Sequence, residues 1–286
     1  MGYLKGGLKP PLAYIYTRKL VIPLLAPPFL TITNYGSDIE LTWTDHPTHE
    51  YFEVHRSDTP YFTPVSGTLL ASLPAGTTAY TDTNAAGAVN INHFYIVRAM
   101  RSGGSQTADS NEVGEIDYAL NNAAGAYSLM TLPFSSTTLV DAASPADYTG
   151  NASALLKWNP DTQTFRFFVP PATGDNFSLA PGEVVFVQVT GGGPEVMTMA
   201  GDVTAVKHSL VPGGFNFISL PLQRADLTTA GEVAADITNI DAMLSWNEAT
   251  QTFRFFVPPA TGDDFSVSVG TPFVIDLDVG GPPEWP

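Results

Sequence analysis

Short apolar runs separated by polar turns recur between residues 29 and 118. In Ile39–Trp43 and Phe52–His55 apolar and polar residues alternate, which is typical of strands with one buried and one solvated face. About seven such runs follow one another at the spacing of an antiparallel sandwich. They are Leu30–Ile32, Ile39–Trp43, Tyr51–Arg56, Thr68–Leu73, Ala79–Thr81, Phe94–Met100 and Asn111–Ile116. The pattern predicts a β-sandwich over residues 29–118.

The same stretch carries a recognisable set of residues: Trp43 in the second strand, Tyr51–Arg56 in the third, Tyr80–Asp82 before a turn, Tyr95–Ala99 in a later strand, and Ser110–Val113. On these residues, residues 29–118 resemble a fibronectin type III domain. The resemblance implies a disulfide-free spacer or adhesion module, usually extracellular and rarely catalytic. No Arg-Gly-Asp tripeptide occurs in the sequence, so integrin-type adhesion is not supported.

The rest of the chain contains an internal duplication. Thr162–Asp175 recurs without change as Thr250–Asp263, an offset of 88 positions, and the same offset relates Trp158 to Trp246. Self-similarity at a fixed period indicates repeated structural units. We therefore predict two copies of one small β module, residues 122–208 and 209–286, each with a hairpin and a closing strand. The predicted hairpin arms are Leu155–Trp158 with Thr164–Val169 and Met243–Trp246 with Thr252–Val257, and the closing strands are Val184–Val189 and Pro272–Leu277.

Each module is mainly β, with a short helix in the second copy. Thr229-Ala-Gly-Glu232 has the spacing of a capping box and predicts a helix start. The modules resemble tandem β modules of secreted bacterial surface proteins, a resemblance that implies no activity. The identical block beginning at Phe165 would suit a doubled sugar site, but buried strand aromatics and turn chemistry explain it more simply. The fold class predicted for the whole chain is all-β.

Composition and charge narrow the possible partners. The 286 residues include 25 glycines and 24 prolines, which favour short strands and turns over long helices. The formal charge of −16 opposes binding to nucleic acid and to anionic membranes. The absence of cysteine excludes disulfides, Cys-ligated zinc, iron–sulfur clusters and a thiol nucleophile. We expect no nucleic-acid partner and no membrane insertion.

Residues that carry catalytic or metal chemistry are sparse. Only His46 and His49 approach ligand spacing, and we expect them in a solvated turn. The sequence has no G-x-S-x-G, P-loop, H-E-x-x-H or EF-hand motif. The pair Asp263-Asp264 corresponds to Asp175-Asn176 in the first copy, so no acid pair is duplicated. We predict a chain that is not an enzyme and uses no metal or cofactor, although a triad assembled from distant residues stays open.

The two ends of the chain look unlike each other. Residues 1–28 form an extended segment whose apolar part, Leu12–Leu25, is interrupted by Arg18 and Lys19 and lacks the pattern of a signal peptide. No run reaches the roughly 18–20 apolar residues that span a bilayer. At the other end, the offset matches Pro286 to Thr198, so we expect the second copy to stop one strand short. A missing strand leaves an open sheet edge, which proteins normally fill.

These ends suggest the first functional hypothesis, an extracellular, pilus-like homopolymer. In this hypothesis each chain donates its N-terminal strand to the last module of the next chain, a head-to-tail contact that generates rings or open filaments. The alternative is that the segment packs on the next domain of its own chain. The predicted donor residues are Tyr14, Ile15, Leu20, Val21, Ile22 and Leu24. The predicted acceptor residues are Phe273, Val274, Ile275 and Leu277.

Two other functional classes stay open. In one, the repeats are carbohydrate-binding accessory modules of a secreted protein, which exposed aromatic faces would favour. In the other, the chain is a phage or virion appendage protein. Asn151 and Asn176 fit the N-x-S/T pattern, so either is a candidate glycan acceptor on an extracellular protein.

Overall fold

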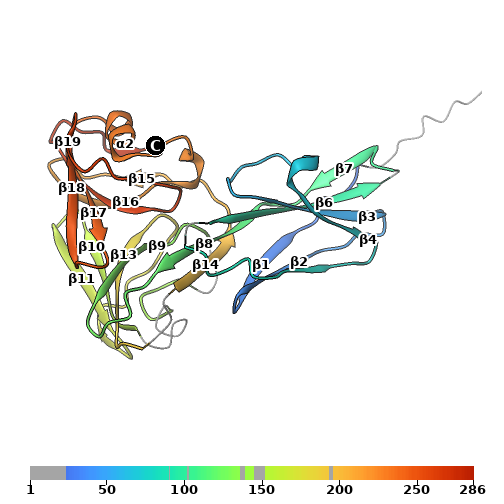
Figure 1. Cartoon of the computed structure of the whole chain (residues 1–286), viewed down its shortest axis with the longest axis horizontal. Helices are drawn as coiled ribbons and strands as arrows, with labels where there is room; N and C mark the ends of the chain where they lie inside the picture. Colours follow the sequence, from blue (N-terminus) through green and yellow to red (C-terminus); the bar gives the residue numbers. More distant parts are fainter. Residues whose placement is uncertain (1–23, 90, 102, 136–138, 145–151, 193–195) are drawn as a thin grey trace, which may run out of the picture.

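The structure, a computed structural model, describes residues 24–89, 91–101, 103–135, 139–144, 152–192 and 196–286. The described chain is nearly all β and forms two lobes (Figure 1). One lobe is a β-sandwich, and the other holds the two duplicated modules. The fold class predicted from the sequence is confirmed.

The first lobe is a fibronectin type III-like sandwich. One sheet has the order β1-β2-β5, and the facing sheet contains the order β4-β3-β6-β8, with β7 beside β6. Trp43 packs in the core with its ring centroid 5.7 Å from that of Phe52, and the Tyr95 hydroxyl donates to Asp82 at 2.9 Å. The strands are β1 (Leu30–Tyr35), β2 (Asp38–Trp43), β3 (Tyr51–Ser57), β4 (Leu69–Pro74), β5 (Ala79–Asp82), β6 (His93–Arg101), β7 (Gln106–Asp109) and β8 (Val113–Ala119).

Strand β14 (Val196–Asp202) crosses the boundary predicted between the sandwich and the first repeat. The sequence assigns it to residues 122–208, but it pairs with β8 of the sandwich, from Val196 opposite Ala119 to Asp202 opposite Val113. Gly201 allows this close packing, because a Cβ there would lie 2.4 Å from the backbone oxygen of Ser135. Strand β14, which follows the first repeat in the chain, therefore belongs to the sheet of the sandwich and not to the sheet of the repeat. A boundary drawn from sequence order missed this, because strand pairing does not require neighbouring positions in the chain.

The two repeats have the same strand order. The first sheet runs β12-β11-β10-β13-β9 and the second runs β19-β18-β17-β20-β16. Trp158 lies opposite Phe165 in the first, as Trp246 lies opposite Phe253 in the second. The strands of the first copy are β9 (Tyr127–Thr131), β10 (Ala152–Asn159), β11 (Thr164–Val169), β12 (Thr173–Gly174) and β13 (Val184–Val189). Those of the second are β16 (Gly214–Ser219), β17 (Ile240–Asn247), β18 (Thr252–Val257), β19 (Thr261–Gly262) and β20 (Pro272–Leu277).

The helix predicted in the second copy is present as α2 (Ala230–Ile237). The side chain of its N-cap, Thr229, accepts from the backbone N–H of Glu232. The Glu232 carboxylate accepts from the backbone N–H of Thr228 at 2.6 Å. Capping of this kind satisfies donors that have no partner within a helix. Val233 and Ile237 on its inner face are buried in the core of the second repeat.

The predicted acceptor strand is not open, which corrects the sequence analysis. Phe273, Val274, Ile275 and Leu277 lie in β20, the middle strand of its sheet, with β16 on one side and β17 on the other. All four side chains are buried. No edge of β20 is left for a donated strand, because its two neighbours already supply the backbone partners.

The expectation of a missing last strand is also wrong. Two short strands, β15 (His208–Ser209) and β21 (Glu284–Trp285), pair with each other beside the second repeat. Trp285 is 4% exposed and stacks on His208, with ring centroids 6.0 Å apart. Its indole N–H donates to Asp236 at 2.7 Å, and Arg224 of the short helix η2 (Leu222–Arg224) lies over its ring. The second repeat is thus closed by its own chain.

Replacing the side chain that closes this repeat tests the description. Trp285→Ala is expected to lower the free energy of unfolding by about 3–5 kcal/mol, because it removes a buried ring and leaves a cavity. Tyr35→Ala is the control, since Tyr35 is an exposed aromatic in the first sandwich, and is expected to cost less than about 1 kcal/mol. Urea unfolding of both variants measures the difference, and similar losses would contradict the closure.

Candidate binding surfaces

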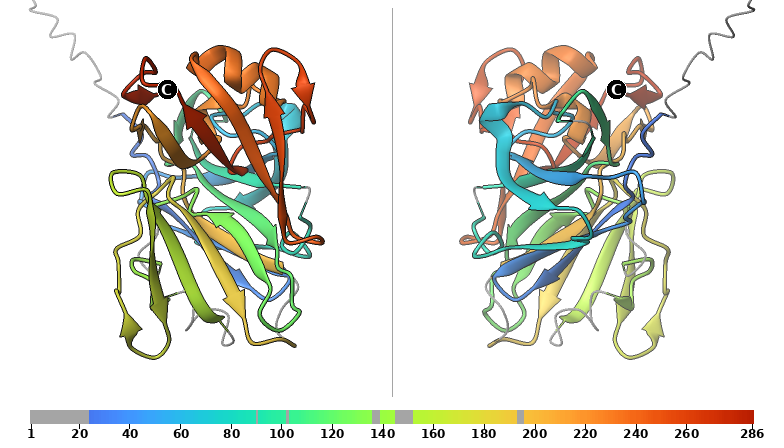
Figure 2. Two further views of the ribbon diagram at one scale, coloured as in Figure 1. Left: turned by 90° about the vertical axis from the view of Figure 1, so that its left-hand side faces the viewer. Right: turned by 90° about the vertical axis from the view of Figure 1, so that its right-hand side faces the viewer.

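The two repeat sheets pack face to face through aromatic side chains. Phe186 of the first copy lies 5.1 Å from Trp246 of the second, between ring centroids, and Phe217 of the second lies 5.3 Å from Trp158 of the first. Most of these ring pairs are tilted or edge-to-face, the arrangement that the aromatic quadrupole favours. The left view of Figure 2 shows the second copy, in orange to red, above the first copy, in green to yellow.

Hydrogen bonds across this interface are reciprocal. The Trp158 indole N–H donates to the backbone oxygen of Phe215 at 2.7 Å, and the Trp246 indole N–H donates to that of Tyr127 at 3.0 Å. Tyr127 and Phe215 are themselves one repeat apart in the sequence. The equivalent glutamines, Gln163 and Gln251, bond the backbone N–H and oxygen of the same two residues. The copies are therefore related by an approximate two-fold axis.

This packing leaves Phe167 and Phe255 as the most exposed phenylalanines among the described residues of the repeats. Phe165 contacts the facing sheet, whereas Phe167, which lies on the same face two residues along β11, is 52% exposed. Its counterpart Phe255 is 53% exposed. Two equivalent apolar surfaces result, which we call the Phe167 platform and the Phe255 platform. The first consists of Phe165, Phe167 and Phe215, and the second of Phe253 and Phe255.

Most of the identical block is explained by structure, in agreement with the core-and-turn interpretation. Phe168 is buried in the core. Arg166 pairs with Asp175 at 2.6 Å and lies over the ring of Phe177, on the face opposite Phe167. Gly174 has φ of 98°, and a Cβ there would lie 2.4 Å from the backbone oxygen of Phe167. These constraints do not account for the exposure of Phe167 and Phe255.

The predicted donor residues fall mostly outside the described part of the chain. Tyr14, Ile15, Leu20, Val21 and Ile22 lie there, and only Leu24 is placed. Leu24 is 95% exposed, whereas the next residue, Leu25, is buried in the core of the first sandwich. The backbone oxygen of Ala26 is bonded to His49 Nε2 at 2.9 Å. The chain thus joins the sandwich at Leu25.

His46 and His49 differ in burial, and of the two candidate glycan acceptors only Asn176 is described. His49 is buried and also bonds Asp45, so the expectation of a solvated turn is wrong for His49, although His46 is exposed. Asn176 is exposed, and its amide donates to Asp141 at 3.0 Å. Asn151 lies outside the described residues. In the described ranges, no three His, Cys, Asp or Glu side chains are grouped to hold a metal ion.

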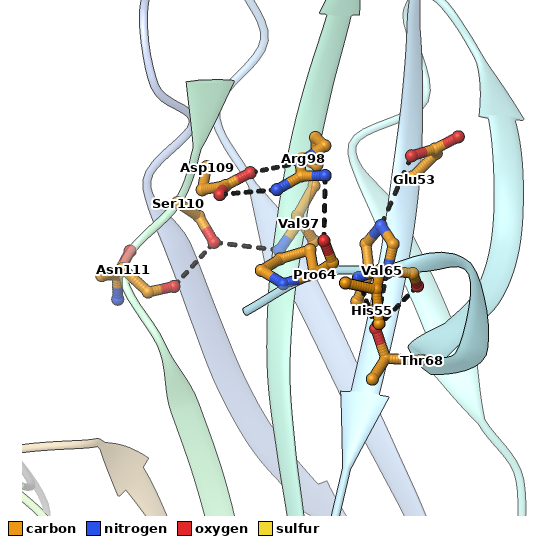
Figure 3. Close-up of polar contacts among 10 residues, drawn as sticks. All are labelled: Glu53, His55, Pro64, Val65, Thr68, Val97, Arg98, Asp109, Ser110 and Asn111. Atoms are coloured by element: carbon orange, nitrogen blue, oxygen red, sulfur yellow. Dashed lines mark hydrogen bonds and ion pairs between the residues drawn. The ribbon is translucent and has the colours of Figure 1, made fainter. Parts of the chain in front are cut away.

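One row of side chains in the sandwich places a hydroxyl, an imidazole and a carboxylate in sequence (Figure 3). His55 Nδ1 lies 3.0 Å from Thr68 Oγ1, and His55 Nε2 lies 3.4 Å from Glu53 Oε2. Thr68, which ends the short helix η1 (Ser66–Thr68), uses its hydroxyl to bond both backbone groups of Val65. His55 is buried, and burial lowers its pKa.

The same view shows what this row does. Arg98 pairs with Asp109 and donates to the backbone oxygen of Pro64 at 3.2 Å (Figure 3). Together these bonds hold the segment before β4 against β3 and β6. Because the Thr68 hydroxyl is committed to the backbone and the imidazole is shielded from solvent, the row is a structural clamp.

Glu248 joins the two repeats at the edge strand β9. Its Oε1 accepts from the backbone N–H of Leu129 at 3.1 Å, and its backbone oxygen accepts from Asn121 Nδ2 at 2.7 Å. Its other carboxylate oxygen is buried without a hydrogen-bond partner among the described residues. Burial raises the pKa of Glu248 to about 7.

The comparisons with known proteins assign this chain to no family. No protein-family model matches the sequence. No curated protein matches it. Among solved structures it is similar to pectate lyase PelI from Erwinia chrysanthemi in complex with tetragalacturonic acid, with a TM-score of 0.25 and 23% identity over 31% of this chain and 27% of that chain. Pectate lyase Pel3 from Pectobacterium carotovorum has a TM-score of 0.25 and 19% identity over 30% of this chain and 26% of that chain.

The FN1–FN3 domains of chicken CNTN1 match 90% of this chain and 95% of that chain, with 11% identity and a TM-score of 0.22. The chain spans about a quarter of the length of the pectate lyases. TM-scores of this size carry no argument about activity, so the description of the fold rests on its strand order. Among the described residues, no helix is both long and apolar enough to cross a membrane.

Neighbouring phenylalanines test the platform. Phe168→Ala is expected to lower the free energy of unfolding by about 3–5 kcal/mol, because Phe168 is a buried core residue. Phe167→Ala is expected to cost less than about 1 kcal/mol, since half of its side chain is already in water. Urea unfolding compares the two, and equal losses would show that Phe167 belongs to the core.

The raised pKa of Glu248 predicts a pH dependence. A carboxyl whose pKa is higher in the folded than in the unfolded chain stabilises the fold below about pH 4.5, and this stability is lost as the pH rises through about 7. Glu248→Gln removes that titration. The variant should therefore gain stability relative to the parent between pH 5 and 8, on the order of 1–2 kcal/mol after solvent screening. Urea unfolding across this range checks it, and parallel curves would contradict it.

Proposed function

We propose that the chain is a structural subunit of an extracellular, pilus-like filament. In this proposal the apolar N-terminal segment of one copy docks on the repeat lobe of the next. The observation that carries the proposal is the presence of two uncovered phenylalanine platforms on a lobe whose other aromatic faces are packed.

The positions of the two partners support a head-to-tail contact. The first described residues lie at the outer end of the sandwich, and the repeats form the opposite lobe (Figure 1). Leu24 is exposed at the point where the N-terminal segment meets the sandwich. A contact between unlike ends of successive copies is heterologous, and such contacts extend into filaments when they do not close into rings.

In this proposal the N-terminal segment docks on one of the two platforms and not on strand β20. A docked strand carrying Tyr14, Ile15, Leu20, Val21, Ile22 and Leu24 would cover Phe167 or Phe255 with apolar side chains. Burying such a side chain gains roughly 1.5–3 kcal/mol as an upper bound. Ordering each backbone residue costs about 1–2 kcal/mol. The balance is close, so the contact becomes favourable where a growing filament adds further contacts.

Two variants of the full chain test the proposal. Deletion of residues 1–23 should abolish filaments, and so should the double variant Phe167→Ser with Phe255→Ser, because each removes one side of the contact. Tyr35→Ser, an exposed aromatic on the other lobe, is the matched control and should leave filaments intact. Negative-stain microscopy and sedimentation velocity measure the outcome.

The possible failures are distinct. Filaments that persist in the deletion variant would rule out the N-terminal donor. If the double variant still forms filaments and the deletion variant does not, the acceptor lies outside the platforms. A parent chain that stays monomeric at all concentrations would overturn the filament itself.

A further inference from the structure

A polar cavity lies where the sandwich and both repeats meet. Its volume is about 370 Å³, and its walls come from β8, from β9 of the first repeat, and from β17 and the segment before β20 in the second. A second cavity of about 400 Å³ shares several of these residues, including Asn92 and Ser268, and continues towards the sandwich loop at Asp58. Volumes of this size lie within the roughly 300–1,000 Å³ typical of small-molecule sites.

The cavity walls are rich in groups that bond hydroxyls. Asn92 and Glu248 supply an amide and a carboxylate, and Trp246 adds an aromatic side chain. Ser268 and Thr271 supply two hydroxyls, which bond each other at 3.1 Å and keep further capacity for a ligand. Glu248 is notable because one of its carboxylate oxygens is buried and makes no hydrogen bond of normal geometry among the described residues, although the Ser128 and Trp246 side chains lie near the carboxylate. A buried carboxylate oxygen without a partner costs free energy, which a bound donor would recover.

The two copies differ in the residues that line this cavity. In the first copy the positions of Ser245, Glu248 and Thr271 are occupied by Lys157, Pro160 and Glu183. There Lys157 Nζ bonds Glu183 at 2.5 Å and the backbone oxygen of Ser178 at 3.1 Å. The repeat fold therefore forms without the polar set of the second copy, so Glu248 is not a requirement of that fold.

The charges of the cavity select a class of ligand. Asp117 also lines it, but its two oxygens accept from the Gly87 N–H, at 2.6 Å, and from the Thr198 hydroxyl. Among the carboxylates of this lining, one oxygen of Glu248 is thus the one left without a hydrogen bond, and a single carboxylate oxygen is too little to hold a hard metal ion. Acidic walls repel anions. A neutral ligand whose hydroxyls both donate and accept fits the remaining groups.

We propose that this cavity binds a short neutral oligosaccharide, with Glu248 accepting a hydrogen bond from a sugar hydroxyl and Asn92 and Thr271 bonding neighbouring hydroxyls. The side chain of Trp246 supplies an apolar wall for the sugar ring. This site is separate from the Phe167 and Phe255 platforms and does not depend on filament formation.

The test uses the full chain and a fixed panel of probes: cellobiose, maltotriose, chitobiose, lactose and mannobiose. Saturation-transfer NMR detects binding, and calorimetry measures the dissociation constant. At least one probe is expected to bind, and Glu248→Ala is expected to weaken it by about tenfold, the loss of one charge-assisted hydrogen bond. Glu183→Gln, at the corresponding surface of the first copy, is the matched control and should bind like the parent.

Three results would overturn the proposal. The first is no binding of any probe, and the second is equal affinity of the parent and Glu248→Ala. The third is loss of binding in Phe167→Ser with Phe255→Ser while Glu248→Ala still binds, which would place the sugar on the platforms. Thermal unfolding of each variant separates loss of binding from loss of fold. Asn92→Ala gives an independent second reading, since Asn92 lies on the sandwich side of the cavity.

Discussion

Two indole N–H groups hold the repeats together, and the arrangement of the second lobe depends on them. Each tryptophan donates across the interface to the edge strand of the other copy, Trp158 to β16 and Trp246 to β9. The Trp158 bond is exposed and the Trp246 bond is partly buried. Each contributes about 0.5–1.5 kcal/mol, and sliding one sheet over the other would lose both bonds at once. The fixed placement of the sheets decides which aromatics are covered, and it leaves Phe167 and Phe255 in solvent.

The duplication shows which residues the fold needs and which it leaves free. Arg166 and Asp175 recur as Arg254 and Asp263, and both pairs brace the same hairpin. Glu248 recurs as proline in the first copy. Both copies form the same sheet and both contact the sandwich, but only the second copy lines the cavity at this junction with Ser245, Glu248 and Thr271. The difference at Glu248 belongs to that junction.

Sequence patterns recovered what local chemistry determines. Alternation located the strands of the sandwich, the 88-residue offset located two matching modules, and capping-box spacing at Thr229 located α2. The partner of β14 was missed, because pairing with β8 connects positions far apart in the chain. The closure of the second repeat was missed for another reason: β15 and β21 are two residues long and carry no alternation to detect.

The candidate sites were harder still to foresee. Phe165 and Phe167 are identical in type and neighbours on one strand face, and their exposed fractions, 41% and 52%, depend on how far the facing sheet reaches. Comparison of the copies did hold one usable signal, the replacement of Pro160 by Glu248 within an otherwise matched frame. The acceptor strand was misplaced because a sequence does not reveal which backbone edges a neighbour already occupies.

The pairing of β14 with β8 has a consequence for the order in which the protein folds on the ribosome. Strand β8 is complete once Ala119 has been made, but its edge partner begins only at Val196. Until the nascent chain has extended past the whole first repeat, the sandwich carries an open edge of backbone donors and acceptors. Translation therefore delivers the two lobes as one interdependent folding unit, and the stretch of synthesis between β8 and β14 is the period in which the edge is most prone to wrong pairing.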